Sequence, residues 1–216
     1  MTTFADGGKS LVGYVRQLTL ADLGPLESLL RSDPVSNCFL DARVRGAGLD
    51  PWRLGGDIWG YLDGDALHSV AYVGANLVPV ATTPASRAAL ADRLRMSPRR
   101  CSSFVGDREE VLDLWRLLGP AWGPAREVSD DQRLLVMDTD ANIPHDPHVR
   151  MATHADMDVL LPACVDMFTE EVGISPVRGG AGSAYRDRVA EIVRAGRSFV
   201  RIVDGRLGFK AEIGAA

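Results

Sequence analysis

Cysteines and long apolar runs are scarce in this chain, and each scarcity excludes a class of protein. Three cysteines lie far apart among 216 residues, which argues against both a disulfide framework and a cysteine-rich metal site. We expect Cys38, Cys101 and Cys164 to be reduced thiols in the core of a cytoplasmic protein. No apolar run approaches the roughly 18 residues of a membrane-spanning helix, and residues 1–16 lack the layout of a signal peptide.

An excess of charge of one sign is lacking as well. The formal net charge is −5 at pH 7, and acidic and basic residues are mixed along the whole chain. Nucleic acids and anionic membranes are bound through basic patches or stripes, and the sequence shows no such pattern. We therefore expect neither a nucleic acid nor a membrane among the partners of this protein.

What the chain does contain is an internal repeat. Residues 15–30 and 149–164 each predict a short strand that leads into a helix. Both helices begin with a capping box, in which a hydroxyl and a carboxylate satisfy backbone N–H groups of the first turn. The two capping pairs are Thr19 with Asp22 and Thr153 with Asp156.

A hairpin also occurs twice, at residues 59–75 and 199–215. Each copy has an Asp-Gly turn between alternating strands, and a one-residue slip at the turn brings further positions into register. The matched positions are Leu67 with Leu207, Ala71 with Ala211 and Gly74 with Gly214. Two blocks in the same order predict duplication of a unit of about 135 to 140 residues.

The first copy occupies residues 1–138 and predicts the order β-α-α-β-β-β-α-β-α-β. Its helices include one that starts at Pro84 and one that ends at Gly119 and Pro120, and its last strand covers residues 133–138. A polar, proline-containing linker follows at residues 139–148.

The second copy occupies residues 149–216. It predicts a strand, a helix that Pro162 kinks, a loop capped by Ser183, a helix near residues 184–195 and the closing hairpin. The predicted fold class is α/β (α+β): two related units with a mixed, mostly antiparallel sheet flanked by helices, of which the second is incomplete. We expect a truncated chain, or one whose exposed C-terminal edge strand is completed by another molecule, as in a homo-oligomer.

This order of elements resembles the GCN5-related N-acetyltransferase (GNAT) fold. The segment VRMATHADMDVLLPACVDMFTEEVGISP is similar to actinobacterial GNAT enzymes that carry an extra N-terminal domain of unknown function. The resemblance implies acetyl-CoA as cosubstrate and a primary amine, on a small molecule or peptide, as acceptor. It also implies direct attack of the neutral amine on the thioester, with backbone donors stabilising the oxyanion.

Members of that family hold acetyl-CoA on a glycine-rich turn between the fourth strand and the next helix, where backbone N–H groups bind the pyrophosphate. In the first copy the corresponding stretch, residues 76–90, has no glycine, and Pro84 removes a donor. In the second copy that stretch would lie beyond Ala216. We therefore assign no cofactor-binding residue and expect the 216-residue chain to be inactive or incomplete as an enzyme. The alternative is a non-catalytic module that binds a ligand or a protein on a GNAT-like scaffold.

Three residues are candidates for acceptor binding, and no catalytic residue is assigned. Glu170 and Glu171 stand at a helix end, where they would bind an amine or assist its deprotonation through water, or would simply be solvated. The resemblance implies that the loop and helix containing Tyr185 border the acceptor side, although Tyr185 also fits a buried helix face.

Two further groups of residues have simpler interpretations. His145, His148 and the nearby His154 are not grouped with other ligands, so a solvated segment is favoured over a metal site. All four tryptophans fall in the first copy. Trp115 shares a helix face with apolar residues and is expected in the core, and a stacking role for Trp52, Trp59 or Trp122 is left open.

Overall fold

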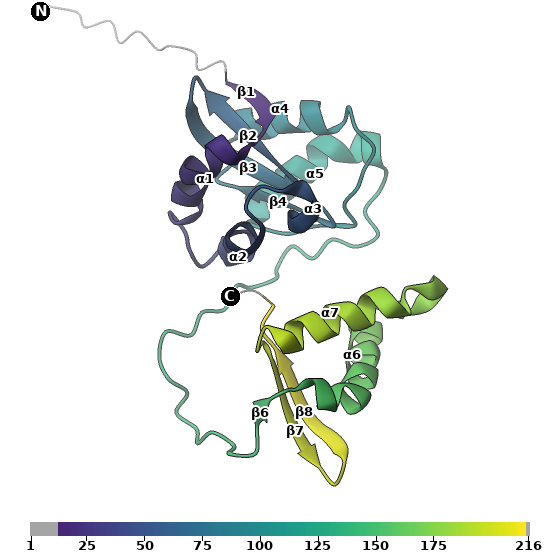
Figure 1. Cartoon of the computed structure of the whole chain (residues 1–216). Helices are drawn as coiled ribbons and strands as arrows, with labels where there is room; N and C mark the ends of the chain where they lie inside the picture. Colours follow the sequence, from purple (N-terminus) through teal and green to yellow (C-terminus); the bar gives the residue numbers. More distant parts are fainter. Residues whose placement is uncertain (1–12, 215–216) are drawn as a thin grey trace, which may run out of the picture. The chain divides into compact units, whose positions relative to one another are not determined.

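A computed structural model describes residues 13–214, which form two compact units. Unit 1 extends to Val136, and unit 2 runs from Met137 to Gly214. Each unit has its own sheet and its own helices (Figure 1). No helix in residues 13–214 combines the length and the apolar character required to span a bilayer.

Unit 1 contains a five-stranded mixed sheet. Neighbouring strands are antiparallel except for β4 and β5, which run parallel. The strand order follows the chain: β1 (Tyr14–Gln17), β2 (Asp57–Asp63), β3 (Ala66–Val73), β4 (Asn76–Val80) and β5 (Ser103–Phe104).

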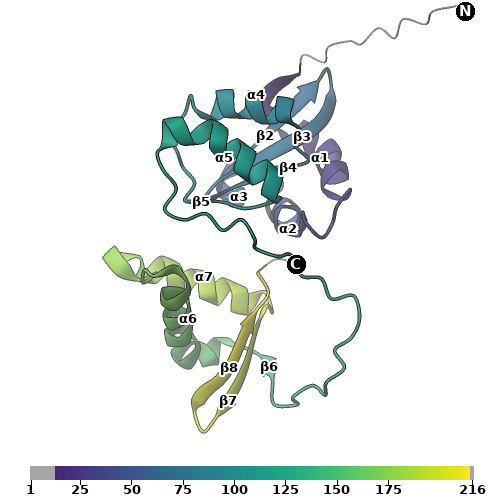
Figure 2. The same cartoon turned by 180° about the vertical axis from the view of Figure 1, so that it is seen from behind.

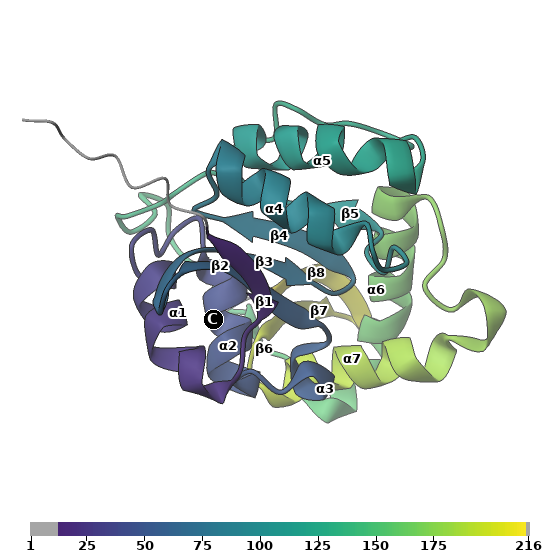
Figure 3. The same cartoon turned by 90° about the horizontal axis from the view of Figure 1, so that it is seen from above.

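Helices cover both faces of this sheet (Figure 3). One face packs against α1 (Leu23–Leu30), α2 (Cys38–Ala47) and α3 (Pro51–Leu54), and the other packs against α4 (Pro84–Leu94) and α5 (Arg108–Trp122). Each face has its own apolar core. Leu26 and Leu30 belong to the first core, and Leu90 and Leu114 belong to the second.

Capping residues fix where these helices begin. Asp50 accepts hydrogen bonds from the backbone N–H groups at the start of α3, and Asp107 does the same at the start of α5. Thr83 caps α4, and Pro84 occupies its first turn as predicted. The short helix α3 was not predicted, although Asp50 followed by Pro51 is a sequence signal for a helix start.

Unit 2 contains a three-stranded antiparallel sheet with helices on one face (Figure 2). Its core is made by apolar side chains of both longer helices and of the central strand, including Leu160, Val189 and Val200. The elements are β6 (Arg150–Met151), η2 (His154–Asp156), α6 (Met157–Val172), η3 (Arg178–Gly180), α7 (Gly182–Arg194), β7 (Ser198–Val203) and β8 (Arg206–Glu212).

The two hairpins share an irregularity as well as a pattern. The register of β2 with β3 shifts between Tyr61 and Leu62, and the register of β7 with β8 shifts between Arg201 and Ile202. Each shift lies at the same distance before the turn, since Leu62 pairs with Leu67 and Ile202 pairs with Leu207. A bulge at the same place in both hairpins supports a structural repeat.

The Asp-Gly pairs themselves are not equivalent. Gly64, with φ of 57°, takes the first position of the turn between β2 and β3. Asp204 and Gly205, with φ of 50° and 73°, take both positions of the turn between β7 and β8. Two residues of positive φ are typical of a type I′ turn, so the two hairpins reverse direction with different turn chemistry.

The entry into the first helix is also repeated. Both predicted capping boxes form, at η1 (Leu20–Asp22), which precedes α1, and at η2. Arg16 of β1 pairs with both oxygens of Asp22 at 2.7 Å, and Arg150 of β6 pairs with both oxygens of Asp156 at 2.8 Å. Each arginine therefore ties the strand to the carboxylate that caps the following helix.

The predicted α+β class is confirmed, but several local predictions are wrong. Residues 133–138 form no strand and pair with no neighbour in the sheet. The helix expected to end at Gly119 and Pro120 continues to Trp122, because a proline so near the end removes only one hydrogen bond. Pro162 lies inside α6, as expected, and the kink predicted there stays a prediction.

Two further expectations about single residues are corrected. Ser183 lies inside the first turn of α7, where the residue at the cap position is Ala181, which makes no side-chain cap. Cys38 is exposed, whereas Cys101 and Cys164 are buried, and all three are free thiols. The first of these cysteines is therefore not a core residue.

Candidate functional site

The turn between β4 and α4 of unit 1 lies where the resemblance implies a pyrophosphate site. Three of its backbone donors are engaged within the turn: the N–H of Thr82 donates to Oε1 of Glu110 at 2.9 Å, and that of Thr83 donates to Oγ of Ser86 at 2.8 Å. The N–H of Ser86 donates back to Oγ1 of Thr83 at 3.2 Å. Pro84 has no N–H to offer.

The side chains at this turn also do little to attract an anion. Glu110 places its carboxyl group on the turn, and burial raises the pKa of that group, which favours its neutral form. Arg87, which is 3% exposed, donates to the carbonyl of Thr82 at 3.0 Å and pairs with Asp113 at 2.6 Å and Glu109 at 3.0 Å. The turn therefore fits the pyrophosphate of acetyl-CoA poorly, since three of its backbone donors and its buried cation are already engaged.

A strained residue precedes this turn. Ala81 has φ of 55°, in the left-handed region that a residue with a Cβ rarely adopts. It connects the end of β4 to the capping residues of α4, so the chain reverses there without the glycine that would adopt this conformation at little cost.

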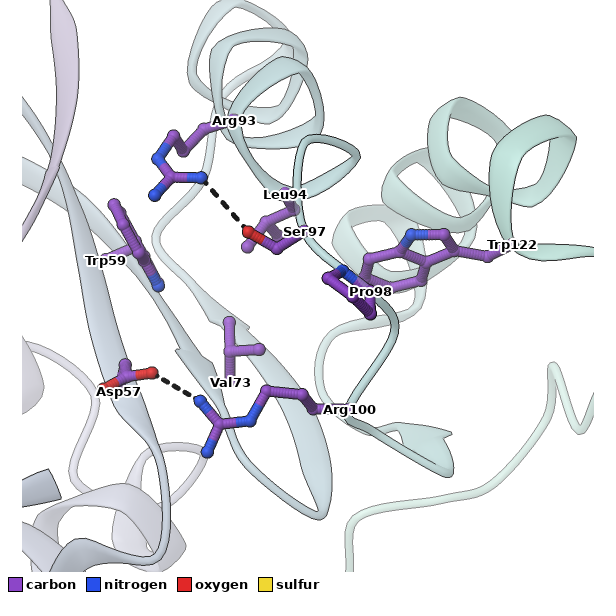
Figure 4. A pocket seen from close by; sticks show the side chains of 9 residues that line it. All are labelled: Asp57, Trp59, Val73, Arg93, Leu94, Ser97, Pro98, Arg100 and Trp122. Carbon is purple, nitrogen blue, oxygen red and sulfur yellow. Dashed lines mark hydrogen bonds and ion pairs between the residues drawn. The ribbon is translucent and has the colours of Figure 1, made fainter. Parts of the chain in front are cut away.

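A cavity of about 220 Å³ opens on the α4 and α5 side of the sheet in unit 1. Figure 4 shows Trp59 of β2 and Trp122 at the end of α5 on opposite sides of it, with Val73 of β3 between them. Val73 and Leu94 of α4 are almost fully buried and make the apolar floor. The ring of Trp122 is held in place by an edge-to-face contact with Phe104, whose centroid is 6.0 Å away.

Two arginines and one aspartate supply the charges of this pocket. The guanidinium of Arg93 lies 4.0 Å from the centroid of the Trp59 ring, and its Nη1 donates to Oγ of Ser97 at 3.4 Å. Arg100 pairs with Asp57 at 2.7 Å (Figure 4), and the other oxygen of Asp57 accepts from Gln17 at 2.9 Å. Sequence reasoning left the role of these tryptophans open and did not identify the arginines.

A polar cluster lies in unit 2, between its helices and β8. Nζ of Lys210 is 3.1 Å from Oε1 of Glu212, although the angle is unsuitable for a hydrogen bond. The thiol of Cys164 donates to the same oxygen at 3.2 Å, and the hydroxyl of Tyr185 donates to the carbonyl of Cys164 at 3.0 Å. Burial raises the pKa of the Cys164 thiol to about 11, which makes it a neutral donor and an unreactive thiol.

The structure places the predicted acceptor residues at different distances from this cluster. Tyr185 belongs to it, and burial raises the pKa of its hydroxyl, with smaller contributions in the same direction from Cys164 and Glu212. Glu170 and Glu171 are both exposed near the end of α6. Lys210 and Glu212 were not identified from the sequence, because the alternation of β8 predicts which residues share a face but not which polar groups meet.

One of the histidines near the start of unit 2 has a carboxylate partner. Nδ1 of His148 is 3.0 Å from Asp146, whose other oxygen pairs with Arg201 at 3.2 Å. The described part of the chain contains no group of three or more histidine, cysteine or acidic side chains that could hold a metal ion.

Comparison with known proteins adds a family match without a function. A family model described as "Domain of unknown function (DUF4081)" matches residues 56–160, from just before β2 into α6. No curated protein and no solved structure matches this chain.

Proposed function

We propose that this protein is an acetyl-CoA-dependent N-acetyltransferase that acts on a primary amine. In this proposal unit 2 supplies the acceptor side of the catalytic domain, and unit 1 is a related lobe without a working cosubstrate turn. The similarity of residues 149–176 to GNAT enzymes and the repeated hairpin scaffold support it.

The observation that carries the proposal is the polar cluster of unit 2. An acceptor amine is a cation at neutral pH, so its site needs a carboxylate that binds ammonium and receives or relays a proton. Glu212, whose side chain is 22% exposed, already lies against the ammonium group of Lys210. The hydroxyl of Tyr185, which donates to the carbonyl of Cys164, lies close enough to Glu212 for that carboxylate to contribute to the raised pKa of the tyrosine.

The proposal assigns acetyl-CoA to no residue of unit 1, because the N–H groups of Thr82 and Thr83 in the turn before α4 are engaged and Arg87 is paired with carboxylates. The proposed contribution of this chain's own residues is to bind and orient the amine at Glu212 and Tyr185.

Hydrogen–deuterium exchange of the full chain, with and without acetyl-CoA and a panel of primary amines, tests the proposal. We expect amine-dependent protection in α7 and β8, and about tenfold weaker amine binding in Glu212→Gln, since a charge-assisted contact is lost. Glu191→Gln, at an exposed position of α7, is the matched control and should bind as the parent does. Protection confined to the turn at Thr82 and Thr83, or none anywhere, would contradict the proposal.

A second candidate function, a non-catalytic ligand-binding role for unit 1, is favoured by the self-capped turn at Glu110. In that case acetyl-CoA would leave unit 1 unprotected while another ligand protects it, and the same exchange experiment separates the two roles. We also propose a cytoplasmic location, which the free thiols support. Isolation of the protein from cells with a disulfide would contradict that location.

A further inference from the structure

The pocket of unit 1 has the size and lining of a site for one small ring system. Its volume is about 220 Å³, below the roughly 300 to 1,000 Å³ of sites for drug-sized ligands and above the roughly 150 Å³ of a cavity that admits benzene. The lining is mainly apolar, with the two tryptophans on facing sides. Indole rings favour aromatic ligands, because they offer large flat surfaces for stacked or edge-to-face contact.

The charges that line the pocket leave one positive charge unbalanced. Arg100 and Asp57 neutralise each other through their 2.7 Å contact. Within residues 13–214, Arg93 makes no ion pair, and its only side-chain hydrogen bond is the 3.4 Å contact with Ser97. Stacking on Trp59 holds its guanidinium in place while leaving most of its N–H groups available.

We propose that this pocket binds a small aromatic carboxylate. The ring would lie against Trp122 and the apolar floor of Val73 and Leu94, and the carboxylate would receive hydrogen bonds from Arg93, whose planar fork suits two oxygens. One unbalanced positive charge matches a monoanion better than a doubly charged phosphate. The volume excludes a nucleotide, whose base, sugar and phosphate together exceed it.

Fluorine NMR of the full chain with 4-fluorobenzoate tests this proposal, with 4-fluorobenzyl alcohol and 4-fluorobenzylamine as probes of the same shape. We expect saturable binding of the benzoate at or below about 1 mM, about tenfold weaker binding of the alcohol, and none of the amine. Equal binding of benzoate and alcohol, or no binding of benzoate up to several times that concentration, would overturn the proposal.

Variants locate the site. Arg93→Gln should weaken benzoate binding about tenfold, and Arg93→Lys should restore only part of the loss, because lysine keeps the charge but not the fork. Arg95→Gln, two residues further along the chain and outside the pocket, should bind as the parent does. Unchanged binding in Arg93→Gln would overturn the assignment, provided that circular dichroism shows the parent fold.

Binding of an aromatic carboxylate in unit 1 does not depend on the proposed acetyl transfer, so either proposal can be disproved without the other. Arg93→Gln should leave amine-dependent exchange protection in α7 and β8 unchanged, because its side chain belongs to unit 1 alone. A loss of both readouts in this variant would count against the assignment of the ligand to this pocket.

Discussion

The same hairpin is built into two different surroundings. In unit 1 the second strand, β3, is buried over its last five residues between α1–α3 on one face and α4–α5 on the other. In unit 2 the equivalent strand, β8, has no buried residue and is covered by helices on one face only. Both hairpins nevertheless have the same bulge, so their register does not depend on burial of both faces.

The uncovered face of unit 2 is apolar. It carries side chains that correspond to positions under α4 and α5 in unit 1, since Phe199 takes the place of Trp59 and Ala211 takes that of Ala71. Phe209 is 46% exposed there, and Met151 is 58% exposed. Fold stability should therefore respond very differently to substitutions on equivalent faces of the two units.

The largest expected difference comes from truncating one side chain on each of these faces. Leu114→Ala should lower the stability of unit 1 by about 2–5 kcal/mol, because Leu114 is fully buried between α5 and the sheet. Phe209→Ala should cost unit 2 about 1 kcal/mol or less. Urea unfolding followed by tryptophan fluorescence reports unit 1 alone, since all four tryptophans lie there, and far-UV circular dichroism reports both units. Equal losses would show that the two faces are equally buried in solution.

A smaller loss of stability, equal in the two units, is expected when either arginine–aspartate contact is removed. Asp22→Ala and Asp156→Ala should each cost about 1–2 kcal/mol, since each carboxylate both caps a helix and binds an arginine. Asp92→Ala, in an exposed pair with Arg95, should change stability by less than about 0.5 kcal/mol.

The stability that the same two carboxylates contribute should decrease in acid. Hydrogen bonds from Arg16 and Arg150 lower the pKa of Asp22 and Asp156 far below the ordinary value of 3.8. Their contribution is therefore fully present above that value and is lost as pH falls below it. The difference in unfolding free energy between the parent and either alanine variant, measured by urea titration, should be smaller at pH 2. A larger difference at pH 2 would contradict the assignment.

The smallest expected change in stability concerns the two non-glycine residues that have positive φ within residues 13–214. Ala81→Gly should stabilise unit 1 by about 0.5–1 kcal/mol, because glycine adopts φ of 55° without the steric cost of a Cβ. Asp204→Gly should be nearly neutral in unit 2, since aspartate tolerates this conformation in turns. A destabilised Ala81→Gly variant, measured by the fluorescence midpoint in urea, would show that the strain is not real.

Local signals made much of this fold predictable. Two helix starts were predicted from capping pairs, Thr19 with Asp22 and Thr153 with Asp156. Two hairpins were predicted from the alternation of apolar residues on each side of the Asp-Gly turns. The strand predicted at residues 133–138 does not form, because a short apolar run becomes a strand only where a neighbouring strand satisfies its backbone hydrogen bonds.

The candidate sites were much less predictable. The stacking of Arg93 on Trp59 joins α4 to β2, and the contact of Cys164 with Glu212 joins α6 to β8. Such meetings depend on how helices pack across a sheet, which no spacing along the chain encodes. The turn before α4 could be predicted only in part. The sequence shows that glycine is missing there, but it does not show that Glu110 approaches the turn.

The Asp-Gly pairs of the two hairpins differ by one position relative to the strands, while the bulge and the strand pairing coincide. A bulge redirects every side chain beyond it, so losing it would exchange the inner and outer residues of the strand, whereas a change of turn type alters only the tip. Packing therefore constrains the bulge more strongly than the turn, and under the predicted duplication the turn sequence would be the part that is free to change.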